Sequence, residues 1–243
     1  MKYLKLIIFS CIFTSTVSTF SQSNFSGIVY YESKISEKVL QEYLKNKKDS
    51  IKYKKLEKTL DKVYFQTKPI NSKIVFSNGK GFYKVEDNLN IGKNDIGMEI
   101  AKVNAGGSDT YYYNEIDKKY LIKDCETLGD CFIYPNEYLE WQLTQETKII
   151  NGYKAFKALR AKGKVIAWYT PKIPVSFGPK GEYGLPGLIL ELEISRSIFI
   201  AKKIILNPKE EIKVEEPKKG KIVSLDEYTK IIGKAKKRVF GNK

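Results

Sequence analysis

The chain has 243 residues, of which 42% are hydrophobic and 13% aromatic, so it can bury a sizeable core and global disorder is excluded. Its 43 basic residues outnumber 28 acidic ones and give a net charge of +15. The absence of histidine excludes Ser-His-Asp and Cys-His catalytic arrangements and imidazole zinc sites. From the sequence we predict no cofactor, no metal site and no catalytic residue.

Residues 1–21 have the pattern of a cleaved secretory signal. Lys2 and Lys5 precede an uncharged, partly apolar run, and small residues allow cleavage near Ser21. A membrane anchor is one alternative, but a span needs about 20 strongly apolar residues and this run is diluted by Ser and Thr. A lipid anchor on Cys11 is another, with a poor match to a lipobox. We therefore expect an exported protein, either periplasmic or associated with the outer membrane.

The expected mature chain, residues 22–243, reads as a single domain that begins with a strand and two helices. Residues 25–34 alternate between apolar and polar side chains, which predicts a strand. Over residues 34–62, apolar residues recur at spacings of three and four with Lys and Glu between them. This spacing predicts a helical insertion, broken into two helices near Asp49.

The middle of the chain favours β structure. β-Branched and aromatic residues occur there in short alternating runs separated by turn residues. We expect strands near residues 63–67, 73–77, 81–86, 110–116, 119–123, 141–145, 155–161, 165–170, 188–194 and 199–206. Residues 88–109 are rich in Gly and Asn and predict a loop. No helix of crossover length separates the strands, so the pairing should be antiparallel.

The last residues, 207–243, form a basic extension that ends in a predicted helix over 225–239. Ser224 and Glu227 have the spacing of a capping box at its start. The fold class is therefore α+β, mainly β: one curved antiparallel sheet or half-barrel, with a helical pair inserted near the N terminus and a C-terminal helix.

The excess positive charge lies at both ends of the mature chain. Residues 34–62 hold ten Lys and five acidic residues, and residues 202–243 hold thirteen basic and six acidic residues. One interpretation is a basic face for an anionic lipid or polysaccharide. The other, which we favour, is a set of solvated lysine-rich helices, because Lys dominates over Arg and acidic residues are interspersed. We expect no nucleic-acid partner, since no recognisable module is present.

Cys125 and Cys131 remain after signal cleavage and flank a predicted turn, Thr127-Leu128-Gly129-Asp130. In an exported protein, such a pair predicts a local disulfide that contributes about 2 kcal/mol in the entropic model. A thiolate metal site, a redox pair and free thiols are the alternatives.

Residues 171–187 combine four of the eight prolines with four glycines and several apolar side chains. Pro fixes the backbone and Gly permits positive φ, so the segment should hold one irregular path. Rigid apolar loops of this kind close over a sheet or frame a binding mouth, although a purely structural plug of the core is an equal alternative. The candidate ligand or partner residues are Trp168, Tyr169, Pro174, Phe177, Gly178, Pro179, Tyr183, Gly184, Leu185, Pro186 and Gly187.

Several motifs in this region resemble one known family. The strings Ala167-Trp168-Tyr169-Thr170-Pro171 and Gly184-Leu185-Pro186-Gly187-Leu188-Ile189-Leu190-Glu191, with Asn151-Gly152-Tyr153-Lys154 before them, are similar to the GLPGLI family of exported bacterial proteins. The resemblance spans roughly residues 141–194. It implies a cell-envelope location and a mostly β fold, and it implies no established activity. Ala155 stands where many members carry Cys, so no role of that Cys transfers.

Three classes of function remain. We favour a binding or interaction module whose concave sheet face, closed by residues 171–187, receives an apolar or peptide-like ligand or an outer-membrane partner. The second class is a hydrolase that works without histidine and uses carboxylates or a Tyr and Lys pair. The third is a structural envelope component that makes weak contacts with an anionic surface through its basic ends. Whether the protein is an enzyme stays open at this point, with a non-enzymatic role favoured.

Overall fold

The computed structural model describes residues 25–49, 57–86, 95–138 and 140–241. The expected signal sequence and its cleavage point lie outside these residues. None of the helices in the described ranges has both the length and the apolar character needed to cross a membrane.

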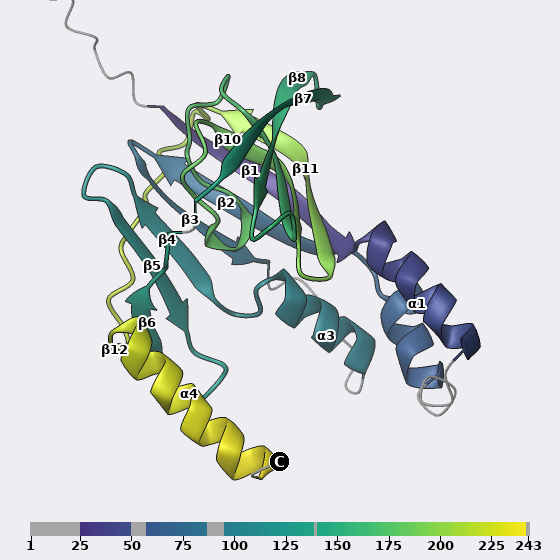
Figure 1. The fold of residues 1–243 in the computed structure, drawn as a ribbon. Helices are drawn as coiled ribbons and strands as arrows, with labels where there is room; N and C mark the ends of the chain where they lie inside the picture. Colours follow the sequence, from purple (N-terminus) through teal and green to yellow (C-terminus); the bar gives the residue numbers. More distant parts are fainter. Residues whose placement is uncertain (1–24, 50–56, 87–94, 139, 242–243) are drawn as a thin grey trace, which may run out of the picture.

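The described chain is mostly β and forms one large open sheet (Figure 1). The strand order is β12-β6-β5-β4-β3-β2-β1-β11-β10-β9-β8-β7. All neighbouring pairs are antiparallel except β12 with β6, which pair in parallel over two residues. The strands are β1 (Ser26–Ile35), β2 (Ile70–Ser77), β3 (Lys80–Val85), β4 (Thr110–Asn114), β5 (Lys119–Asp124), β6 (Phe132–Pro135), β7 (Gln142–Ile150), β8 (Tyr153–Arg160), β9 (Val165–Thr170), β10 (Leu188–Ile194), β11 (Ser197–Leu206) and β12 (Lys221–Ile222).

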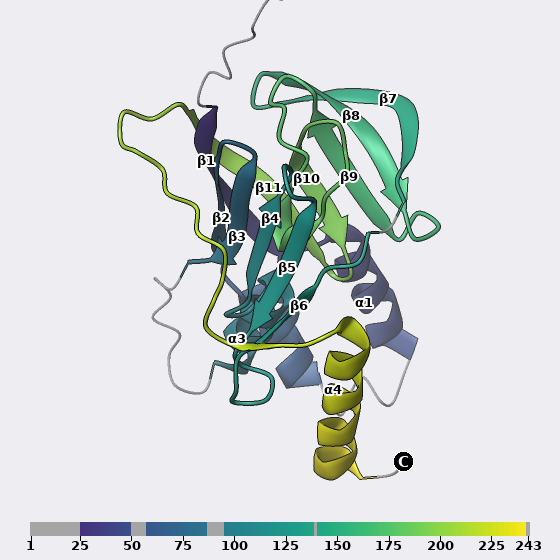
Figure 2. The ribbon, with the colours of Figure 1, turned by 90° about the vertical axis from the view of Figure 1, so that its left-hand side faces the viewer.

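The core lies on one side of this sheet. Along β1, Val29, Tyr31 and Ser33 are buried while the residues between them are more exposed, as the alternation of a strand requires. Figure 2 shows β7, β8 and β9 on the right of the molecule and β3 to β6 to their left. The segment that joins β9 to β10 packs against β3 and β4 across this arrangement. The core is therefore closed by a segment between strands and not by a second sheet.

The N-terminal helices differ in part from the prediction. Helix α1 (Glu37–Asp49) forms as expected. Residues 50–56, about half of the predicted second helix, lie outside the described residues, and residues 57–61 are helical and lead into a π-helical turn, η1 (Lys62–Gln66). The predicted strand over 63–67 is therefore wrong. Tyr64 of this turn stacks on Tyr43 of α1 with ring centroids 4.2 Å apart. Packing against α1 thus outweighs the β propensity of Val, Tyr and Phe.

The prediction of a loop over 88–109 is wrong for its second half, where α3 (Ile96–Ala105) forms; residues 88–94 lie outside the described residues. Asp95 caps this helix by accepting a hydrogen bond from the Met98 amide at 3.1 Å. Gly106, at φ +127°, ends it. The Tyr83 hydroxyl donates to the Ala105 carbonyl at 2.6 Å and ties the helix end to the sheet.

The C-terminal extension returns along the sheet, adds β12 to the edge strand β6, and ends in α4 (Leu225–Phe240) (Figures 1 and 2). The predicted capping box is present: Ser224 and Glu227 exchange hydrogen bonds with each other's backbone amides. Tyr228 stacks on Tyr134 of β6 with centroids 3.8 Å apart. This contact holds the first turns of α4 on the sheet edge.

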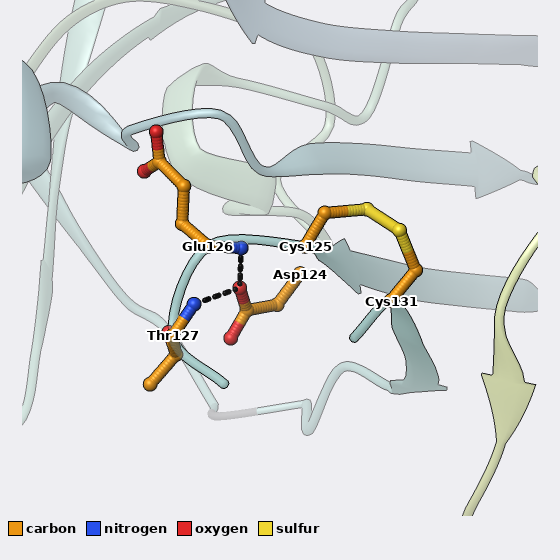
Figure 3. The surroundings of a disulfide bond; sticks show 5 residues. All are labelled: Asp124, Cys125, Glu126, Thr127 and Cys131. Atoms are coloured by element: carbon orange, nitrogen blue, oxygen red, sulfur yellow. Dashed lines mark hydrogen bonds between the residues drawn. A yellow bond between two sulfur atoms is a disulfide. The ribbon is translucent and has the colours of Figure 1, made fainter. Parts of the chain in front are cut away.

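Cys125 and Cys131 form a disulfide in the turn between β5 and β6 (Figure 3). Asp124, next to it, accepts hydrogen bonds from the amides of Glu126 and Thr127 at 2.9 and 3.1 Å. The Tyr228 hydroxyl donates a short hydrogen bond to the other Asp124 oxygen. The disulfide turn and α4 are therefore fastened to each other through one carboxylate.

Candidate functional site

The proline-rich loop, residues 171–187, is folded back on itself as a small hairpin between β9 and β10. Phe177 and Tyr183 form a β-bridge, and the Gly178 amide donates to the Glu182 carbonyl at 2.7 Å. The turn of this hairpin is a short 3-10 segment, η2 (Pro179–Gly181), in which Lys180 has φ +54°. We call residues 176–184 the tip hairpin.

The apolar side chains of the loop fill the core side of the sheet. Phe177 stacks on Tyr113 of β4 with centroids 4.4 Å apart, and Tyr183 stacks on Tyr120 of β5 at 3.8 Å. Ile173 and Leu185 are completely or almost completely buried. The space beneath the loop is thus occupied by the loop's own side chains, as in the plug alternative.

Polar contacts fix the loop at several points. The Trp141 indole N–H donates to the Tyr183 carbonyl at 2.9 Å, and the Asn136 amide group donates to the Gly181 carbonyl at 2.8 Å. The buried Tyr31 hydroxyl donates to the Ile189 carbonyl at 2.6 Å just after the loop. These donors come from strands or turns far away in sequence, so the loop position depends on the complete sheet.

The structure brings together only part of the residue set predicted from the sequence. Trp168 and Tyr169 are neighbours on a strand and point to opposite faces: Tyr169 is buried, whereas Trp168 lies beneath Lys148, whose Nζ is 4.3 Å from the ring centroid. The buried members of the loop are Phe177, Gly178, Pro179, Tyr183, Leu185 and Gly187, and the exposed members are Pro174, Gly184 and Pro186.

A hollow of about 270 Å³ opens beside the tip hairpin, between it and strands β5 and β6. We call it the tip cleft. Its walls mix aromatic, apolar and charged groups. The lining residues used below are Ile122, Tyr134, Glu137, Arg160, Glu182 and Tyr183.

A buried ion pair forms one wall of the tip cleft. A short hydrogen bond joins the Arg160 Nη2 atom to the Glu182 carboxylate, and the two side chains are only 9% and 12% exposed. The guanidinium also lies over the Trp141 ring, 5.3 Å from its centroid. Burial raises the pKa of Glu182, and the attraction of Arg160 offsets this only in part. The Arg160 Nε donor is buried without a hydrogen-bond partner, which is rare in folded proteins.

A wider, more open groove of about 590 Å³ adjoins the tip cleft and shares Pro135, Asn136 and Tyr183 with it. Tyr120 and Tyr138 provide aromatic walls, and Tyr138 is 53% exposed. We call this the tyrosine groove. Together the two hollows offer rigid aromatic surface beside charged groups, which suits recognition of a ligand with both apolar and polar parts.

Asp109 lies in the short connection between α3 and β4, within the electrostatic reach of Lys180 of the tip hairpin. Burial, reinforced by the charge of Asp124, raises its pKa to about 7. Lys180 of the tip reaches toward the end of α3 and donates to the Asn104 carbonyl at 3.1 Å, and burial lowers its pKa. A carboxyl group with a pKa near 7 can exchange protons at neutral pH, in a chain that has no histidine.

Sequence reasoning missed Arg160, Glu182 and Asp109, which are distant along the chain. One signal was available: only three of the 43 basic residues are arginine, and Arg160 is the one that precedes the loop. Arg is preferred over Lys in buried ion pairs, so an isolated Arg beside an apolar loop favours such a pair. Within the described ranges, no cluster of three or more Cys, Asp or Glu residues is arranged to hold a metal ion.

Comparison with known proteins gives a family match over the loop and a likeness in fold. Residues 159–191 match the model of the family described as "Protein of unknown function (Porph_ging)". This segment begins at β8 and includes Arg160, Glu182 and the entire loop. The match supports an uncharacterised family as the relative of this part of the chain. Among curated proteins, no sequence gives a significant match.

Two solved structures of PNGF-II, in space groups P21 and C2, are similar in fold. Each has a TM-score of 0.52, with sequence identities of 15% and 14%. The alignments cover 87% and 88% of this chain and 34% of the PNGF-II chain, so this chain spans about a third of that protein's length. At this identity the likeness concerns the fold alone.

Proposed function

We propose that this protein is an exported cell-envelope binding module of the GLPGLI type, and that its ligand or partner binds in the tip cleft and the tyrosine groove. The signal-like pattern of residues 1–21 supports export. The GLPGLI string within a segment that matches an uncharacterised family supports the family proposal. No activity follows from either observation.

The observation that carries the binding role is the buried, incompletely satisfied Arg160 in the wall of the tip cleft. Its Nε donor has no partner, although unpaired buried donors are rare in folded proteins. An acceptor group on a ligand, such as a carbonyl or carboxylate, would satisfy it. The adjoining Tyr138 and Tyr183 would then contact the apolar part of the same ligand.

The loop serves this role as a fixed wall and does not act as a moving gate. Its backbone is restricted by Pro and its apolar side chains are packed into the core, so little conformational entropy is lost when a ligand contacts the tip. The sequence predicted a ligand site between the loop and the sheet, whereas we propose a site beside the loop. The family match over 159–191 covers the hairpin and Arg160, and of the tyrosine groove it covers only Tyr183 and Gly184.

The test uses ligand-induced stabilisation of residues 22–243. Envelope extract is separated into peptide, lipid and saccharide fractions, and each is added during thermal unfolding, because a ligand that binds only the folded state raises the Tm. The cleft variants are Tyr138→Ser and Glu137→Gln, both at exposed positions. Phe65→Ser is the matched control, since Phe65 is 50% exposed and lines neither the tip cleft nor the tyrosine groove.

We expect one fraction to raise the Tm of the wild-type protein and of Phe65→Ser, and to have a smaller effect on the two cleft variants. The bound component is then identified by mass spectrometry. Equal stabilisation of all four proteins, or none in any fraction, would show that the cleft is not the binding site.

A further inference from the structure

Helix α4 is amphipathic, and only its first turns rest on the sheet. Tyr228 packs on β6, while Figures 1 and 2 show the later turns continuing beyond the sheet. At 100° per residue, Ile231, Ile232 and Ala235 lie within about 60° of Tyr228 around the helix axis. All three are half-buried. The apolar stripe that begins at the sheet edge therefore continues where no strand lies beneath it in the two views.

The rest of the helix surface is strongly basic. Between residues 229 and 237 there are four lysines and no acid, and all four lysines are exposed: Lys230, Lys234, Lys236 and Lys237. The acids of the helix, Asp226 and Glu227, are confined to the first turn, where Glu227 completes the capping box. The charge of the free turns is therefore uncompensated within the helix.

We propose that these free turns, residues 229–237, dock the protein on the surface of an anionic lipid bilayer. Helices with an apolar stripe and a lysine-rich polar surface lie in the membrane interface, where the stripe enters the acyl boundary and the lysines attract anionic headgroups. A soluble polyanion would satisfy the lysines but leave the stripe in water. The combination of both features on one helix therefore favours lipid over polysaccharide.

Docking through α4 also has a geometric consequence. Leu225, the first residue of α4, lines the tip cleft. A bilayer bound by the later turns would thus lie at the end of the same helix whose start borders the cleft. This inference does not depend on the ligand proposed above, because the docking surface and the cleft are tested by different variants.

The experiment is co-sedimentation of residues 22–243 with vesicles. Vesicles of phosphatidylcholine alone are compared with vesicles of phosphatidylcholine and phosphatidylglycerol. The charge variant replaces four lysines with glutamine: Lys230, Lys234, Lys236 and Lys237. The charge-matched control makes the same replacement at four other exposed lysines: Lys38, Lys45, Lys58 and Lys162. The stripe variant is Ile231→Ser with Ile232→Ser, and circular dichroism and thermal unfolding report whether each variant is folded.

We expect the wild type and the control to bind only the phosphatidylglycerol vesicles. Each lysine near an anionic surface raises the membrane partition coefficient by a factor of about five. The partition coefficient of the charge variant should therefore be at least about a hundredfold lower than that of the wild type. The stripe variant should also lose binding at unchanged charge. Equal binding by the wild type and the charge variant, or an equal loss of binding in the control, would overturn the proposal. So would unchanged binding by the stripe variant together with equally strong binding of the wild type to a soluble anionic polysaccharide.

Discussion

Asp109 allows a sharp test of the electrostatics around the tip hairpin. Burial and the neighbouring charge of Asp124 raise its pKa from 3.8 to about 7, against the opposing effects of Lys180 and of the Tyr111 hydroxyl, 3.3 Å from its carboxylate. The folded protein therefore holds a proton at pH 5 to 6 that the unfolded chain has released. Stability should fall as the pH rises from about 4 to about 7. At pH 8, where Asp109 is ionised in both states, the full destabilisation should be present.

The size of this cost follows from the shift. About three pKa units at 1.36 kcal/mol each set an upper limit of about 4 kcal/mol. Because the Asp109 side chain is partly exposed, solvent screening reduces the effect, and we expect about 2 to 3 kcal/mol. The neutral isostere Asp109→Asn keeps an acceptor for Tyr111 and should be more stable than the wild type by this amount at pH 8, with little difference at pH 4.

The assay is urea unfolding of both proteins at half-unit steps from pH 4 to pH 8.5. The chain has no histidine, so few other groups titrate in the interval in which Asp109 does. Asp117→Asn, which removes a charge at an exposed position, is the control and should leave the pH dependence unchanged. A stability difference between wild type and Asp109→Asn that stays constant across this range would refute the reasoning.

Three further predictions concern the loop and are measured by urea unfolding at pH 7. Gly187→Ala should lower the free energy of unfolding by at least about 3 kcal/mol, because φ is +155° and a Cβ atom would lie 2.1 Å from the Thr170 carbonyl oxygen. The control Gly152→Ala, at φ +79° in open space, should lower it by only about 1 kcal/mol. Phe177→Ala should cost about 3 to 5 kcal/mol, and a smaller loss would mean that the loop does not close the core. Arg160→Met should cost about 3 to 5 kcal/mol by leaving Glu182 unpaired, whereas the double replacement of both residues by Met should restore stability to within about 1 kcal/mol.

Local pattern sufficed for most of the sheet. The alternation of β1, β2, β3 and β9 was visible in the sequence because one face of each strand is more buried than the other. The capping box of α4 was equally visible, since it depends on residues three apart. Features that depend only on residues within one element or one turn could therefore be predicted from the sequence.

Features that depend on contacts between residues far apart in the sequence could not be predicted. Strand β6 has four residues and gains its identity from pairing with β5, so no period could reveal it. Helix α3 was hidden by Gly and Asn around it, although Asp95 and Gly106 are the residues that bound it. The tip cleft joins Ile122, Arg160 and Glu182 from three separate parts of the chain. The spacing of these residues along the sequence does not indicate that they are close together in the fold.

The position of β1 has a consequence for how the chain is made. This first strand lies between β2 and β11, and Gly27 is paired with Leu206 in the central ladder. The middle of the sheet thus cannot assemble until nearly the whole polypeptide exists, and pairings of such large sequence separation form slowly. A newly synthesised chain therefore passes through a stage in which its central ladder is unpaired, and the export proposed above would have to take place during this unfolded stage.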